Sequence, residues 1–443
     1  MTATSAATRR DRAVRAAVTQ GLLGPGLPLA ALLDVHGVRA GAARLRAAFA
    51  AVTDAPVLHT FAVKACPLVP VVRLLADAGL GAEVASPGEL ALSRAAGVGP
   101  AATVLDSPAK TPAELREALA LGIAVNADNP QELDRLDALT ASAPTASPLG
   151  LRINPQLGAG TIGALSTATA TSKFGVALRD EGARAWVLDA YAARPWLTRL
   201  HVHSGSQGVP VALMAEGVRV TYELAREINA RAGRRQVDTV DIGGGLPVDF
   251  TSDEAEPAFE AYARLLRAEA PGLLDGTFAL VTEFGRALLA KHGTVLARVE
   301  YVKRSGGRPI AVTHAGVQLA TRTVYAPDDW PLRIAAYDRE GRPKRGPVLV
   351  QDVAGPACFA GDLLARGRAL PALEQGDHVA ALDTGAYGFA HHYAYNSLAR
   401  PGVYGFREGP DGVRFTVVRA PQTLAQVVAE SGGDRPDALL GDG

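Results

Sequence analysis

Short apolar runs alternate with longer stretches of helical periodicity between residues 40 and 295. The run 57–64 is typical of a buried strand, and residues 69–78 carry apolar side chains at helical spacing. The same pairing of a short run with a helical stretch recurs along this region. Strands separated by helices and short loops form parallel sheets, and about eight such units close into a barrel. The pattern therefore predicts an α/β fold with a TIM-like (β/α)8 barrel over residues 40–295.

The pattern changes after residue 295. Strand-like segments follow one another, separated by Gly and Pro, and few stretches are convincingly helical. These segments are residues 294–303, 309–313, 348–353, 378–382 and 413–418. We expect a C-terminal antiparallel β-barrel domain of residues 296–443, joined by residues 1–39 because an apolar run at 29–33 precedes the barrel.

Composition excludes several classes of protein. The 443 residues are 48% hydrophobic, and Lys+Arg equals Asp+Glu at 45 each, so no basic stripe points to nucleic acid. The two cysteines, Cys66 and Cys358, form neither a disulfide framework nor a metal-ligand spacing, which favours a reducing compartment. No segment approaches the ~20 apolar residues of a membrane span, and Pro25 and Pro28 interrupt the apolar run that follows the N-terminal arginines. We expect a cytoplasmic protein that binds neither nucleic acid, membrane nor metal.

Lys64 ends the apolar run Phe61-Ala62-Val63-Lys64. Taken alone, such a lysine is most often a snorkelling or salt-bridged side chain. At the C-terminal end of the first barrel strand, where barrel active sites assemble, its amine can instead form an imine with an aldehyde cofactor. The neighbouring motifs decide between these two interpretations.

Three further motifs follow predicted barrel strands. His201-Val202-His203-Ser204-Gly205-Ser206 offers an imidazole and a hydroxyl, although a histidine satisfied by backbone carbonyls is the plainer reading. Gly243-Gly244-Gly245 is a turn whose N–H groups can approach an anion closely. In Glu283-Phe284-Gly285-Arg286, the carboxylate can hold a pyridine nitrogen protonated and the arginine can reach a phosphate; a surface ion pair is the alternative.

The order of these motifs resembles the fold-type III pyridoxal-phosphate decarboxylases, which include diaminopimelate and ornithine decarboxylases. The resemblance covers roughly residues 40–400. It implies that Lys64 carries pyridoxal 5'-phosphate as a Schiff base, that His203 stacks on the cofactor ring and that Glu283 holds the pyridine nitrogen. It also implies the phosphate-binding residues, which are Ser206, Gly243, Gly244, Gly245, Gly285, Arg286 and Tyr387.

The predicted β-domain carries the remaining candidates. The resemblance implies that Cys358, in Gly355-Pro356-Ala357-Cys358, reaches the site of a neighbouring subunit and helps to protonate the product carbanion, within a head-to-tail homodimer with shared active sites. In the amine-reading members the residue after this cysteine is acidic, whereas here it is Phe359. An aromatic ring cannot pair a distal ammonium group. Asp362 is the nearest substitute, and Arg322 remains a candidate for holding a substrate carboxylate.

His391 and His392, after the Tyr387 loop, are either substrate contacts or a solvated turn. The sequence thus predicts a decarboxylase that removes the α-carboxylate of an amino acid or amino-acid-like intermediate, with diaminopimelate and ornithine disfavoured by Phe359. An amino-acid racemase or epimerase on the same fold is the alternative. A non-catalytic regulatory relative is a third, which fits less well because the cofactor ligands are all retained.

Overall fold

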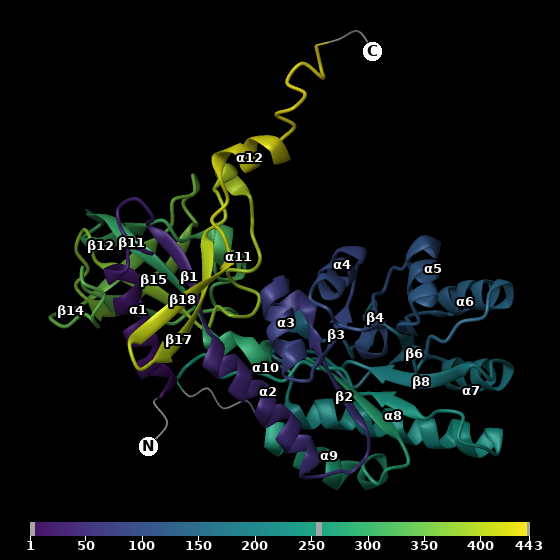
Figure 1. Ribbon diagram of the computed structural model, residues 1–443. Coiled ribbons are helices and arrows are strands. Elements are labelled where there is room, and N and C mark those ends of the chain that lie inside the picture. The colour runs from purple at the N-terminus through teal and green to yellow at the C-terminus, as the bar shows by residue number, and fades with distance from the viewer. Residues whose placement is uncertain (1–4, 254–258, 441–443) are drawn as a thin grey trace. The chain divides into compact units, whose positions relative to one another are not determined.

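The computed structural model describes residues 5–253 and 259–440, which form two compact units (Figure 1). One unit contains residues 38–248 and 259–289, and the other contains residues 5–37, 249–253 and 290–440. These limits lie within a few residues of the boundaries at 40 and 295 read from the sequence, except that the short segment 249–253 groups with the second unit. No described helix is long and apolar enough to cross a membrane.

The first unit is a closed barrel of eight parallel strands. Each strand pairs with the next, and the last strand, β10, pairs with the first, β2. The strands are β2 (Val57–Ala62), β3 (Gly81–Val84), β4 (Thr103–Asp106), β5 (Ala124–Ala127), β6 (Leu149–Asn154), β8 (Leu197–Val202), β9 (Thr239–Asp241) and β10 (Ala279–Phe284). The short strand β7 (Val176–Ala177) adds to β6. The predicted (β/α)8 barrel is confirmed.

Helices follow the barrel strands and begin at strong local signals. Ser86, Thr111 and Asn129 cap three of them by accepting a backbone N–H, and a proline occupies the first helical position each time. The helices of this unit are α3 (Val69–Asp77), α4 (Pro87–Ala95), α5 (Pro112–Leu121), α6 (Pro130–Ser142), α7 (Ala183–Ala193), α8 (Val211–Ala232), α9 (Phe259–Glu269) and α10 (Arg286–Leu289). Helix α2 (Val35–Ala50) precedes β2.

Neighbouring side chains of β10 point to opposite faces of the barrel wall. Phe284 is fully buried and packs against Phe259 and Tyr262 of α9, with ring centroids 5.4 and 6.3 Å away. Successive strand residues point to opposite faces, so Glu283 faces the other way, into the barrel. The large apolar side chain beside Glu283 therefore anchors the strand against its helices.

The second unit is built on a nine-stranded sheet. Its strands are β1 (Leu29–Asp34), β11 (Gly293–Ser305), β12 (Arg308–Thr313), β13 (Ile334–Tyr337), β14 (Val348–Ala354), β15 (Leu363–Pro371), β16 (His378–Leu382), β17 (Gly402–Gly409) and β18 (Gly412–Arg419). Most pairings are antiparallel, but β1–β17 and β12–β14 are parallel, so the sheet is mixed where a purely antiparallel one was expected. The parallel pairs join segments far apart in sequence, which local patterns do not encode.

Three helices of the second unit had no counterpart in the sequence prediction. They are α1 (Ala6–Thr19), α11 (Val317–Tyr325) and α12 (Leu424–Glu430). Helix α1 has four arginines, which hide its short apolar stripe of Ala13, Val14 and Ala17. That stripe packs into a core that includes Leu296 and Tyr337.

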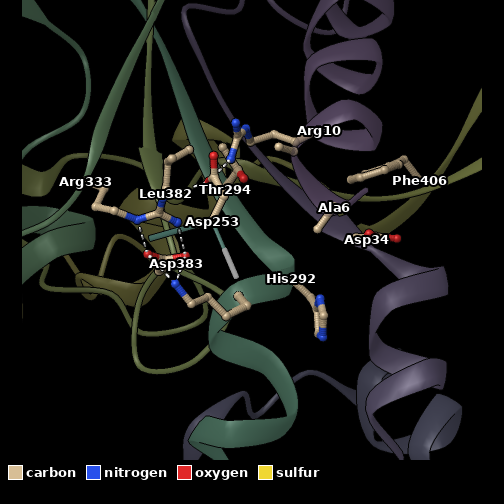
Figure 2. A pocket seen from close by; sticks show the side chains of 12 residues that line it. Ala6, Arg10, Asp34, Asp253, His292, Thr294, Arg333, Leu382, Asp383 and Phe406 are labelled. Carbon is tan, nitrogen blue, oxygen red and sulfur yellow. Dashed lines mark hydrogen bonds and ion pairs between the residues drawn. The ribbon is translucent and has the colours of Figure 1, made fainter. Parts of the chain in front are cut away.

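A charged network lines a small pocket of the second unit (Figure 2). Arg333 forms a two-pronged contact with Asp383, at 2.8 and 2.9 Å, and a third bond of 2.7 Å with Asp253. Arg10 of α1 also binds Asp253, at 2.8 Å, and Lys291 lies 3.4 Å from Asp383. Because each of these cations faces a carboxylate, the network ties segment 249–253 and α1 to the sheet.

Candidate active site

The C-terminal ends of the barrel strands carry a layer of buried polar side chains. Branched apolar residues normally fill a barrel interior, so a polar layer at this end marks a site. Register places Asp106 beside Asn126, and His201 between Arg152 and Asp241. The layer consists of Glu83, Asp106, Asn126, Arg152, His201, Asp241 and Glu283.

Lys64 lies just beyond this layer, in the 3₁₀ turn Val63–Ala65 that follows β2. The predicted strand 57–64 thus ends two residues early, at Ala62. The Lys64 Nζ contacts the carboxylate of Glu83, which is 1% exposed, while the lysine side chain is 39% exposed. A buried carboxylate beneath a half-exposed amine fixes the direction of the amine at the barrel mouth.

His203 follows β8 and is neutral in this environment. Burial, together with the positive charges of Arg152 and Lys64, lowers the pKa of His203 well below its usual value. Its Nδ1 accepts a 3.0 Å hydrogen bond from the Gly244 N–H, so the ring proton of the neutral imidazole is on Nε2. The arrangement gives a fixed, uncharged, flat ring beside the amine.

The triple-glycine turn is shaped by close backbone approaches. Gly243 and Gly245 have φ values of 64° and 94°, and a Cβ on Gly245 would overlap the carbonyl oxygen of Gly205. The Gly243 N–H donates to Asp241 Oδ1 at 3.0 Å, and the Gly244 N–H donates to His203. Among the described residues, only the Gly245 N–H of the three has no partner. Of the three predicted phosphate donors, Gly245 is the one whose N–H remains available.

Ser206 and Arg286 lie next to this turn. Arg286 is buried, and its Nη2 is 3.4 Å from the Ser206 Oγ. Gly285 precedes it, and a Cβ there would lie 2.8 Å from the Ala65 Cβ, so glycine lets β10 approach the Lys64 turn. A guanidinium, a hydroxyl and the Gly245 N–H together make a donor set that suits a phosphate group.

Glu283 and Asp106 are close in space but differ in ionisation. Burial and the negative charges of Asp106 and Glu83 raise the pKa of Glu283 well above its usual value. Burial also opposes ionisation of Asp106, yet the attraction of the neighbouring His201 holds the pKa of Asp106 well below its usual value. Two neighbouring carboxyl groups with opposite pKa shifts are a common arrangement in active sites.

The buried acids form a connected cluster. Four side chains each bring one nitrogen or carboxylate oxygen atom to within 4.8 Å of the others: Asp106, His201, Asp241 and Glu283. The Asn126 amide donates to Asp106 Oδ2 at 3.2 Å and to Asp241 Oδ2 at 3.4 Å. Burial and repulsion from Glu283 raise the pKa of Asp241 well above its usual value. The cluster is therefore stabilised by protonation and donor bonds as well as by nearby cations.

In the second unit, Asp362 supports the backbone of its loop. Its Oδ1 accepts the Val317 N–H at 2.6 Å, and its Oδ2 accepts the Ala357 N–H at 2.7 Å. The side chain is buried, and both oxygens are engaged. This arrangement differs from the amine-reading role suggested by its spacing from Cys358. Cys358 itself is exposed, and its N–H donates to Asn396 Oδ1.

Phe359 belongs to a ring of four aromatic side chains, which we call the aromatic quartet: Tyr325, Phe359, Tyr393 and Tyr395. Phe359 stacks on Tyr325 at 5.9 Å and meets Tyr395 edge-on at 5.5 Å. Tyr393 completes the ring, 6.3 Å from Tyr325 and 6.0 Å from Tyr395. Such edge-on and offset contacts stabilise an aromatic surface, and this one remains partly exposed.

Arg322 and Tyr387 lie together near this loop. The Arg322 guanidinium carbon is 4.6 Å from the Tyr387 ring centroid and 5.2 Å from that of Trp330. Two cation–π contacts hold the guanidinium by its faces and leave its edge donors for an anion. His391 packs on Tyr387 at 5.8 Å, and burial lowers the pKa of His392.

Residues 38–290 match the family model described as "Pyridoxal-dependent decarboxylase, pyridoxal binding domain". The chain belongs to the pyridoxal-dependent decarboxylases. This enzyme family acts on amino acids as carboxy-lyases and uses pyridoxal 5'-phosphate, so the predicted cofactor, reaction class and amino-acid substrate are confirmed.

Known relatives cover most of the chain. A diaminopimelate decarboxylase of Pseudomonas aeruginosa is 32% identical over 87% of this chain and 89% of its own length. One from Actinosynnema pretiosum is 34% identical over 88% of this chain and 85% of its own length. The crystal structure of the Helicobacter pylori diaminopimelate decarboxylase with L-lysine superposes with a TM-score of 0.80, at 24% identity, over 92% of this chain and 97% of the other. That structure supports the fold. These relatives are decarboxylases, so they do not favour the racemase alternative.

The barrel site of this decarboxylase fits its cofactor. Glu283 Oε1 is buried without a hydrogen-bond partner among the described residues, which suits a ring nitrogen. Lys64 would offer the amine, His203 would offer a flat face, and Gly245, Ser206 and Arg286 would offer donors to the phosphate. When bound, pyridoxal phosphate supplies an electron sink for the carbanion left by the departing carboxylate.

Several site residues escaped the sequence prediction. Glu83, Asp106, Asn126, His201 and Asp241 were not assigned roles, although the structure brings them to Lys64 and Glu283. One signal was available, because each is a polar residue at or near the end of an apolar strand. Since all the strand ends of a parallel barrel share one rim, polar residues at those ends are expected to meet.

Proposed function

We propose that this decarboxylase removes the α-carboxylate of an amino acid whose distal end bears no free ammonium group. One observation carries this proposal: Phe359 lies in the aromatic quartet, and the nearby Asp362 directs both carboxylate oxygens to backbone N–H groups. The position of Phe359 is acidic in the amine-reading members of the family. An ammonium group beside these aromatic rings, with both Asp362 oxygens engaged, would lack the charge partner that an acidic residue supplies.

The names of the relatives point to diaminopimelate, whose distal carbon carries both an ammonium and a carboxylate group. Arg322, held by Tyr387 and Trp330, is able to bind a distal carboxylate through its edge. The quartet offers apolar surface in place of the ammonium partner. We therefore favour a distal carboxylate, or an amide or acyl derivative of one, over a distal amine.

In the proposed reaction, each residue has a defined task. Lys64 would hold the cofactor through its side-chain amine and would release it to the amine of the substrate. Glu283 holds the proton on the ring nitrogen, His203 supports one face of the ring, and Gly245, Ser206 and Arg286 hold the phosphate. Cys358 returns a proton to the α-carbon after carbon dioxide leaves.

A substrate panel tests the proposed specificity. The purified holoenzyme is incubated with diaminopimelate, lysine and ornithine, and with analogues whose distal amine is acylated or replaced by a carboxylate, while released carbon dioxide is measured. We expect the analogues without a distal amine to have the higher kcat/KM. A wild-type preference for diaminopimelate would refute the proposal.

Phe359→Glu sharpens this test. It restores an acidic group and is expected to shift relative kcat/KM toward the distal amines by about tenfold or more, the value of one charge-assisted pair. Tyr301→Glu is the matched control, because Tyr301 is an exposed aromatic residue outside the quartet. Equal shifts in both variants would show that a general charge effect, and not the quartet, determines specificity.

We also propose that the enzyme works as a head-to-tail homodimer in which Cys358 acts in the site of the partner subunit. The exposed Cys358 fits this role, since its side chain is accessible at the surface of the described chain. The test mixes inactive Lys64→Ala and Cys358→Ala subunits. If sites are shared, random reassociation restores about a quarter of the sites, whereas sites contained in one subunit give no recovery.

A further inference from the structure

A chain of three buried groups runs across the barrel beneath the mouth. Asp106 Oδ1 lies 3.2 Å from His201 Nδ1, and His201 Nε2 lies 3.6 Å from Glu283 Oε2. All three side chains are at most 6% exposed, and they come from β4, β8 and β10. The imidazole is therefore placed between two carboxyl groups in a site from which bulk water is excluded.

His201 is the only one of the two neighbouring histidines that is placed to donate to Glu283. The Nδ1 of His203 also approaches Glu283 Oε2, at 3.9 Å, but it accepts the Gly244 N–H and so carries no proton. Neither nitrogen of His201 makes a hydrogen bond among the described residues, so the two carboxyl groups are the charged groups that its ring nitrogens face. An imidazole that carries a proton on each nitrogen donates from two opposite edges at once, whereas a neutral imidazole donates from one edge only.

Asp106 is held in place for this contact. Its second oxygen, Oδ2, accepts the Asn126 amide at 3.2 Å, which leaves Oδ1 directed at His201. A fixed carboxylate behind an imidazole selects its orientation and stabilises its positive charge. The same arrangement leaves the opposite edge of His201 facing Glu283.

We propose that His201, oriented by Asp106, is a positioning residue that keeps Glu283 in its carboxylate form when the ring nitrogen of the cofactor is protonated. This inference rests on the proposed role of Glu283 as the partner of that nitrogen. The proton shared by Glu283 and the ring nitrogen has two possible locations. With the His201 N–H facing it, the carboxylate of Glu283 is stabilised and the proton resides on the ring; without His201, repulsion from Asp106 keeps the proton on Glu283.

The experiment reads the protonation of the ring nitrogen directly. Full-length protein is loaded with pyridoxal phosphate labelled with 15N in the ring, and the 15N chemical shift of the bound cofactor is measured. The variants are His201→Gln and Glu283→Gln. The control is His59→Gln, because His59 is a buried barrel histidine that contacts the Thr282 hydroxyl at 2.9 Å and not the Glu283 carboxyl.

We expect a protonated ring nitrogen in the wild type and the His59→Gln control, and an unprotonated one in His201→Gln and Glu283→Gln. The ratio of protonated to unprotonated ring nitrogen in His201→Gln should be at least about tenfold lower than in the wild type, which is the effect of losing one charged donor. Loss of the proton in Glu283→Gln but not in His201→Gln overturns this inference alone. An unprotonated ring in the wild type, or a protonated one in Glu283→Gln, overturns the proposed role of Glu283 instead.

Substitution in a buried cluster can prevent folding, so a measurement on the wild type completes the test. With 15N-histidine incorporated, His201 should show protons on both nitrogens in the holoenzyme, in contrast to His203 with a proton on Nε2 alone. A single protonated nitrogen on His201 overturns the inference, whatever the variants do.

Discussion

Asp362→Asn tests whether the buried aspartate of the Cys358 loop is structural. The carboxylate accepts two backbone N–H groups, from Val317 at 2.6 Å and from Ala357 at 2.7 Å. Asparagine keeps the shape but has one acceptor oxygen, so its NH2 group must face one of the two N–H donors. Each bond to a charged acceptor contributes about 1.5–3 kcal/mol, so losing one and creating a donor–donor contact should cost about 2–3 kcal/mol.

This loss is large enough to measure. For a unit of this size, a loss of 2–3 kcal/mol lowers the melting temperature by about 5–10 °C. Thermal unfolding followed by circular dichroism and by differential calorimetry should show this decrease. Asp328→Asn, an exposed acidic residue in the same unit, is the control and should leave the melting temperature within about 1–2 °C of the wild type.

The kinetic consequences separate the two possible roles of Asp362. A structural residue should lower stability without changing the ranking of substrates. If Asp362→Asn kept the wild-type melting temperature but raised KM selectively for substrates with a distal amine, Asp362 would be a substrate-reading residue. That result would refute our interpretation of its two backbone bonds and would reopen diaminopimelate as the substrate.

Two further predictions follow from the same structure. Gly245→Ala should weaken cofactor binding at least about tenfold, measured by titration of the apoenzyme, because a Cβ would overlap the Gly205 carbonyl at a φ of 94°; unchanged affinity would contradict the assigned turn geometry. Burial opposes ionisation of Asp253, but its bonds to Arg10 and Arg333 lower its pKa to about 2. Its stabilising contribution is therefore complete above pH ~4 and lost as the pH falls toward 2. Asp253→Asn should flatten the stability profile over that range, and a profile identical to the wild type would contradict the proposed network.

The barrel follows from local patterns, and so does the placement of three candidate cofactor residues at its rim. Lys64, His203 and Glu283 each come directly after or at the end of an apolar run, and parallel strand ends must meet at one rim. The layer of buried polar side chains at the C-terminal ends of the barrel strands was harder to predict. Asp106 and Asn126 are ordinary polar residues in four-residue strands, and their role appears only when closure of the barrel brings β4 and β5 opposite β8 and β10.

The second unit was less predictable for a different physical reason. Strand β1 pairs with β17 across most of the chain, and no local pattern encodes such a contact. The two backbone contacts of Asp362 depend on the absence of a side chain at Gly316 and at Gly355, because a Cβ at either position would collide with the Asp362 carboxylate oxygens. Spacing from Cys358 placed Asp362 near the predicted substrate, but spacing does not report the direction in which a side chain points.

The buried acidic layer also affects the stability of the enzyme before the cofactor binds. Glu83, Asp106, Asp241 and Glu283 occupy space that apolar side chains would fill in a barrel built only for stability. The empty barrel must therefore hold mutually repelling groups, partly by protonating them, and it gives up some of its resistance to unfolding. A bound pyridoxal phosphate would place its ring nitrogen beside these acids, and the positive charge of the protonated ring would offset that repulsion. The apoenzyme should thus be more sensitive to heat and proteolysis than the holoenzyme. The supply of cofactor would then determine how much folded protein accumulates.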